Sequence, residues 1–203
     1  MRSICGAVTA FSAICLVVAM GGTAAAEPLD ELRKTFTVDD KPVPPEIFAD
    51  FGDADLADSG PIVVAIDARA ATGSNRYADP IRKQGRWIVQ TKPSDKTLNG
   101  AEETAYECIG ATRDNLLVLV ASYNGGGSGT FYTLHILDAA AAPAFDADGK
   151  RYERLNLTVL RSVPLGDRWE GEIAISGNAV RIKSSHEGPA KGIAPKSLEA
   201  RRP

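Results

Sequence analysis

Apolar and polar residues alternate with a period of two along much of the chain after residue 60, and this pattern predicts β-strands. The alternation is clearest over residues 152–163, where Leu160 is the one residue that interrupts it. No segment after residue 60 carries the 3.6-residue periodicity of a sustained helix. We therefore expect an all-β domain over residues 61–184, an antiparallel β-sandwich or barrel of about eight strands.

Turn-forming residues divide this region into the expected strands. The strands are expected at residues 62–66, 87–91, 104–109, 116–122, 130–137, 152–163, 169–175 and 180–182. The run 116–122 is almost wholly apolar, so burial on both faces is expected. A glycine-rich loop joins it to 130–137, which predicts a hairpin. Ala139 to Pro143 is expected to be a connector, and Asp146 to Gly149 a tight turn.

The first 26 residues have the pattern of a secretory signal peptide. Arg2 precedes an apolar run over residues 4–20, and small residues at 24–26 complete an A-x-A cleavage pattern. Cleavage is therefore expected between Ala26 and Glu27, which predicts a periplasmic or secreted protein.

Two alternatives to a cleaved signal are less consistent with the sequence. A retained membrane anchor would carry basic residues after the apolar run, whereas small residues follow it here. A lipid anchor at Cys15 is disfavoured because the bulky Ile14 directly precedes it. After residue 26, no apolar stretch is long enough to cross a membrane.

Cysteine content and charge exclude further classes of protein. Of three cysteines, only Cys108 lies beyond the predicted signal, so no internal disulfide is expected and packing must supply the stability. We expect Cys108 to act as a small buried residue. The formal charge of the chain is −3 and its basic residues are scattered, unlike the basic footprint of a nucleic-acid-binding protein.

The β domain is expected to have two flanking segments. Residues 27–60 form an N-terminal entry segment with short helical turns at 29–36 and 46–51, the second favoured by Pro45 in its first turn. Residues 185–203 are rich in glycine, proline and basic residues, which predicts a flexible C-terminal tail.

Three stretches of the sequence resemble, in their order along the chain, a family of uncharacterised exported bacterial proteins. They are Ala70 to Tyr77, Gly125 to Phe131 and Leu165 to Trp169. The family carries a G-G-S-G-x-F hairpin loop and a downstream L-G-D-R turn, and the resemblance covers residues 61–183. It implies export and these domain limits, and it implies no activity or cofactor.

A ligand is expected to bind where these loops meet, since recognition usually resides on loops held by a rigid scaffold. The residues expected to contact it are Ser74, Asn75, Arg76, Tyr77, Ser128, Asp167, Arg168 and Trp169. Asp167 and Arg168 also suit a purely structural turn. An aromatic platform for sugars or peptides is a further hypothesis, and packing in the core is its alternative. The platform would comprise Trp87, Tyr77, Tyr123 and Tyr132.

Catalytic patterns are incomplete. The loop Gly125 to Gly129 lacks the lysine and the following helix of a phosphate-binding loop, so a hairpin loop is the simpler interpretation. Ser128 could act as a nucleophile only with His135 as its base, and Thr130 stands where a nucleophile elbow has glycine.

Acidic residues offer a second set of incomplete catalytic and metal patterns. The acidic turn at 146–149 lacks the later ligands of a calcium loop. Glu170 and Glu172 could form a carboxylate pair, but cross-strand ion pairs with Arg181 and Lys183 explain them more simply. No metal or cofactor is expected.

The function that fits these observations is an exported envelope-accessory or binding module for an unknown small ligand, glycan or envelope protein. One alternative is a hydrolase acting on an envelope polymer or glycan, which requires converging catalytic groups. The other is a protein–protein partner or inhibitor, which requires an exposed apolar patch or an unpaired edge strand.

Overall fold

The computed structural model describes residues 26–51, 65–73, 77, 79–92, 100–183 and 196–202. Almost all of the predicted signal peptide lies outside these ranges, as do residues 52–64 and 184–195. Three of the predicted ligand contacts, Ser74, Asn75 and Arg76, also lie outside them.

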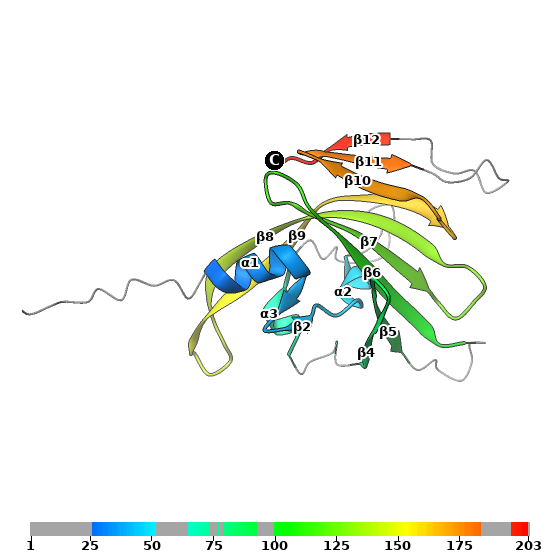
Figure 1. Ribbon diagram of the computed structural model, residues 1–203. Helices are drawn as coiled ribbons and strands as arrows, with labels where there is room; N and C mark the ends of the chain where they lie inside the picture. Colours follow the sequence, from blue (N-terminus) through cyan, green and yellow to red (C-terminus); the bar gives the residue numbers. More distant parts are fainter. Residues whose placement is uncertain are drawn as a thin grey trace, which may run out of the picture.

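The largest element is a seven-stranded antiparallel sheet with the order β3-β9-β8-β7-β6-β5-β4 (Figure 1). Its strands are β3 (Ala65–Asp67), β4 (Ile81–Gln84), β5 (Trp87–Lys92), β6 (Glu102–Ala111), β7 (Leu117–Asn124), β8 (Phe131–Phe145) and β9 (Arg151–Asp167). From β4 to β9 each strand pairs with the next along the chain, whereas β3 pairs with β9 at the far edge. The predicted all-β class is confirmed.

A three-stranded antiparallel sheet covers one face of the large sheet (Figure 1). Its strands are β10 (Glu172–Ser176), β11 (Ala179–Lys183) and β12 (Lys196–Glu199). A hairpin around Gly177 joins β10 to β11, close to the strands expected at residues 169–175 and 180–182. β12 lies within the stretch expected to be a flexible tail, and it is ordered because Leu198 and Ala200 are buried against the large sheet.

The N-terminal segment covers the opposite face (Figure 1). It consists of α1 (Ala26–Thr35), β1 (Thr37–Val38), β2 (Lys41–Pro42) and α2 (Ile47–Asp50), and the short α3 (Ala68–Ala71) joins the same layer. The predicted helical turns are therefore present. Leu32, Phe36 and Phe48 are buried in this layer, so the segment is part of the core and not only an entry to it.

The central strand β7 contributes to both cores, as its apolar sequence predicts. Leu117, Leu119 and Ala121 pack with the N-terminal segment. Val118 and Val120 pack under the three-stranded sheet. The seven-stranded sheet is thus the middle layer of a sandwich-like fold and is buried on both sides.

The β8–β9 hairpin is longer than predicted. The expected connector Ala139 to Pro143 is part of β8, because the whole segment pairs in register with β9. Leu160, which interrupts the sequence alternation, is the extra residue of a β-bulge, since Ile136 pairs with Arg161 and Leu137 pairs with Val159. Between β8 and β9 the chain reverses in the predicted tight turn around Gly149, which has a φ of 76°.

Candidate functional site

Two of the three loops predicted to hold a ligand lie together. The Oδ1 atom of Asp167 accepts a hydrogen bond from the backbone N–H of Thr130 at 2.8 Å. The guanidinium of Arg168 donates to the backbone oxygen of Ser128 at 2.9 Å. Both side chains therefore hold the glycine-rich loop in place, which is the structural role that the sequence also suggested for them.

From the third predicted loop, the structure describes one expected ligand contact, Tyr77. This residue lies beneath the N-terminal segment. Its hydroxyl donates to the carboxylate of Asp50 in α2, and its backbone oxygen accepts from the side-chain amide of Gln90 in β5. Tyr77 belongs to the same buried cluster as Phe48 and Phe51, and it also lines a cavity of about 380 Å³ beside the N-terminal segment.

The glycine-rich loop is shaped by a close approach of two backbones. A Cβ atom on Gly126 would lie 2.6 Å from the backbone oxygen of Gly100, and Gly126 has a φ of 86°. Both facts require glycine at this position. A strand follows the loop, so the N-terminal helix end that binds phosphate in a phosphate-binding loop is missing.

The hypothesis of a Ser128–His135 pair is wrong. The Nδ1 atom of His135 lies 2.9 Å from the Oγ atom of Ser162 on the neighbouring strand. Ser128 precedes β8, and the strand from Phe131 to His135 alone spans about 14 Å. Burial also lowers the pKa of His135 to about 4, so the imidazole is a weak base near neutral pH.

Three aromatic side chains lie together where the two sheets meet. The ring centroids of Trp87 and Tyr132 are 5.9 Å apart, and those of Tyr132 and Trp169 are 6.4 Å apart. Beside them lies a cavity of about 290 Å³, which we call the tryptophan cleft. Its lining residues are Arg86, Trp87, Glu107, Cys108, Ile109, Val120, Trp169, Gly171, Glu172 and Ile173.

Local sequence explains how the aromatic walls are placed. Trp87 begins β5 directly after a tight turn in which Gly85 has a φ of 63°. Trp169 follows Arg168, whose φ of 50° turns the chain from β9 toward β10. A Cβ atom on Gly171 would lie 2.2 Å from the backbone oxygen of Lys183 and 2.3 Å from the Trp169 ring, so only glycine lets the indole pack there.

An ion pair closes one side of the cleft. The Oε1 atom of Glu107 lies 3.0 Å from the Nε atom of Arg86. The Glu107 side chain is only 10% exposed, whereas that of Arg86 is 84% exposed. The carboxylate is therefore part of the folded interior and its cation lies at the surface.

The remaining polar groups of the cleft limit its chemistry. Glu172 is paired with Lys183 at 3.2 Å, as the sequence suggested for this strand pair. Burial raises the pKa of the Cys108 thiol to about 11, so Cys108 is protonated at neutral pH and is a poor nucleophile. The Nε1 atom of Trp169 is buried and has no hydrogen-bond partner among the described residues.

The sequence pointed to the aromatic residues of the cleft and to Glu172, but not to the ion pair of Glu107 with Arg86. Trp87 and Tyr132 belong to the predicted platform, and Trp169 to the predicted turn. Glu107 was missed, although a charged residue inside the apolar strand 104–109 is the signal that could have revealed it. Tyr123, another predicted platform residue, instead pairs across strands with Phe131, and both are exposed.

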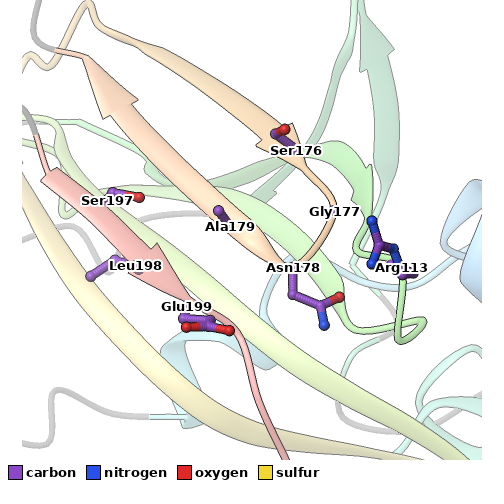
Figure 2. A pocket seen from close by; sticks show the side chains of 8 residues that line it. All are labelled: Arg113, Ser176, Gly177, Asn178, Ala179, Ser197, Leu198 and Glu199. Carbon is purple, nitrogen blue, oxygen red and sulfur yellow. The ribbon is translucent and has the colours of Figure 1, made fainter.

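A second hollow lies between the β10–β11 turn and β12 (Figure 2). It has a volume of about 500 Å³ and a mostly polar lining. Asn178 exchanges hydrogen bonds with Asp114, and Glu199 pairs with Arg201 at 2.7 Å, so these side chains already have partners within the protein. Because the lining contains no aromatic residue, the tryptophan cleft is the stronger candidate site.

Among the described residues, no three His, Cys, Asp or Glu side chains are grouped so that they could hold a metal ion. The helices in the same ranges are too short or too polar to cross a membrane.

Comparison of the chain with protein-family models, with curated proteins and with solved structures gives no match. The resemblance to exported bacterial proteins therefore stays a prediction, and the candidate site depends on its geometry alone.

Proposed function

We propose that the protein is an exported binding module of the cell envelope whose ligand enters the tryptophan cleft. The observation that carries this proposal is the convergence of Trp87 and Trp169, the two tryptophans of the chain, on one cavity that also contains the buried carboxylate of Glu107. The signal-like N-terminus supports the exported location.

The composition of the cleft supports binding. Ligand pockets are usually lined by aromatic and apolar side chains with a few placed polar groups, and this cleft combines two indoles with Glu107 and Arg86. Both indoles are half-buried, so each ring has one part fixed by packing and another that a ligand can contact. Trp87, Glu107 and Ile173 lie on paired strands, which hold these groups in position before a ligand arrives.

Intrinsic fluorescence tests the proposal directly, because every tryptophan of the protein lines the cleft. The purified mature protein is titrated with chitotriose, trialanine, spermidine and arginine amide while emission is recorded. We expect at least one probe to change the emission saturably. Its affinity should fall about tenfold or more in Trp87→Ala and in Trp169→Ala, because each removes one wall of the cleft.

Tyr123→Ala is the matched control, since it removes an exposed aromatic side chain outside the cleft. This variant should bind like the wild type. Binding that persists unchanged in both tryptophan variants would place the site elsewhere. A panel in which no probe changes the emission or raises the unfolding temperature would also contradict the proposal.

A further inference from the structure

We infer that the tryptophan cleft binds an organic cation, a guanidinium or ammonium group, and that this cation displaces Arg86 from Glu107. The inference rests on the proposed function, because it concerns the same cleft. It adds the chemical class of the ligand and assigns Arg86 as the group that occupies the carboxylate in the free protein.

The two side chains of the Glu107–Arg86 ion pair are unequally buried. Glu107 is fixed on β6, where its side chain is 10% exposed, and a carboxylate in that position needs a cationic partner. Arg86 lies in the turn between β4 and β5, and its side chain is 84% exposed. Such an exposed cation is well hydrated when it leaves, so its exchange for another cation costs little.

Aromatic side chains line the cleft beside the carboxylate of Glu107. The face of an indole ring attracts cations more strongly than the other aromatic side chains do. Trp87 and Trp169 both line the cavity into which Glu107 faces. A cation in the cleft would therefore meet a carboxylate and two indoles, whereas the side chain of the present partner, Arg86, is mostly exposed to solvent.

Other carboxylates near the cleft already have cationic partners. The pKa of the Tyr132 hydroxyl is raised, first by burial and then by the charges of Glu170, Asp167 and Glu103. Glu103 and Asp167 each have an arginine partner and do not line the cleft, and Glu172, which does, is paired with Lys183. The buried carboxylate of Glu107 thus determines the preferred charge of the ligand.

The volume of the cavity limits the size of the ligand. A cavity of about 290 Å³ is at the lower limit of the roughly 300–1,000 Å³ that hold drug-sized ligands. It has room for one guanidinium or ammonium group with its alkyl chain. Such a group can come from a free polyamine or amino-acid derivative, or from a basic side chain of a peptide.

The test compares arginine amide with citrulline amide, which has nearly the same shape and no charge on its side chain. Binding is followed by tryptophan emission and calorimetry. We expect saturable binding of arginine amide and a loss of about tenfold or more for citrulline amide. Spermidine and the peptide Gly-Arg-Gly then distinguish the two sources, and the tighter binder identifies the source.

Two substitutions test the displacement of Arg86. Arg86→Gln removes the competing cation, so arginine amide should bind several-fold more tightly. Glu107→Gln should weaken its binding by about tenfold or more. The matched controls are Arg82→Gln and Glu103→Gln, which break an ion pair that does not line the cleft and should change affinity by less than about twofold.

Each outcome bears on the inference. Equal binding of citrulline amide, or an Arg86→Gln variant with unchanged or weaker affinity, overturns it, and neither measurement requires a change at the buried Glu107. If chitotriose or trialanine binds through both tryptophans while arginine amide does not, the binding module stands and the cation assignment fails. If no probe binds, the proposed function fails as well.

Discussion

The imidazole ring of His135 packs against the ring of Phe48, with 5.1 Å between their centroids. The histidine lies on β8 and the phenylalanine on α2, so this contact packs the N-terminal segment against the large sheet. On its other side, His135 is paired with Ser162 of β9. An ionisable group is thus enclosed between two layers of the core.

The stability of the protein should fall in mild acid because of this histidine. Burial lowers the pKa of folded His135 from 6.5 to about 4, so the unfolded chain takes up a proton at a higher pH than the folded one does. The stabilisation is complete above about pH 6.5 and is lost as the pH falls to about 4. The free energy of unfolding therefore falls by about 3 kcal/mol over this range.

Urea unfolding at pH 7.5 and pH 4.5 measures this effect, and His135→Gln provides the comparison. The variant is expected to lose less stability between the two pH values than the wild type, because glutamine does not titrate. An equal loss in both proteins would show that His135 is not the group responsible.

Gly171→Ala should destabilise the fold and disturb the tryptophan cleft. The added methyl group would meet the Lys183 backbone oxygen and the Trp169 ring, and crowding of this kind costs about 1–3 kcal/mol. Chemical denaturation gives the free energy of unfolding, and the emission maximum reports the displaced indole. Gly127→Ala is the control, since a Cβ atom there meets nothing within 4 Å. Equal stability of the two variants would contradict the packing described here.

Asp167→Ala should lower the free energy of unfolding by about 1 kcal/mol, because the backbone N–H of Thr130 loses its acceptor. Amide hydrogen exchange at Thr130 should become faster at the same time. Asp148→Ala, at an exposed position of the β8–β9 turn, should leave both quantities unchanged. A normal exchange rate at Thr130 in Asp167→Ala would rule out this structural role.

The predicted signal peptide can be tested in a bacterial expression host. Mass spectrometry of the periplasmic or secreted protein should find a chain that begins at Glu27. Ala26→Arg should leave an uncleaved precursor, because the position before the cut requires a small residue. Ala25→Gln, between the two small residues of the A-x-A pattern, should still be processed. A precursor that stays uncleaved in the wild type would contradict export by this route.

Local patterns in the sequence were sufficient for the fold class and for the positions of most strands. The continuous apolar run 116–122 predicted a strand buried on both faces, because successive side chains of a strand point to opposite sides and here both sides are apolar. The turn at Gly149 was predicted because glycine adopts positive φ without strain, and Gly149 has a positive φ. The glycine-rich loop after residue 122 likewise predicted the pairing of β7 with β8.

The pairing of distant segments required the tertiary structure. β3 pairs with β9, and no local pattern specifies partners so far apart in the chain. β12 pairs with β11 within a stretch whose composition predicted a flexible tail, because only its burial against the large sheet orders it. The bulge at Leu160 adds one residue to the register of β8 and β9, so the partner of each side chain beyond the bulge cannot be read from the spacing alone.

The candidate site shows the same division. The sequence by itself determined that Trp87, Tyr132 and Trp169 lie on or beside strands, because alternation and turn residues are local properties. Only the tertiary structure decided that they meet over Glu107 and that Arg86 covers this carboxylate. The physical reason is that burial and ion pairing depend on which strands and layers come together, and long-range packing decides that.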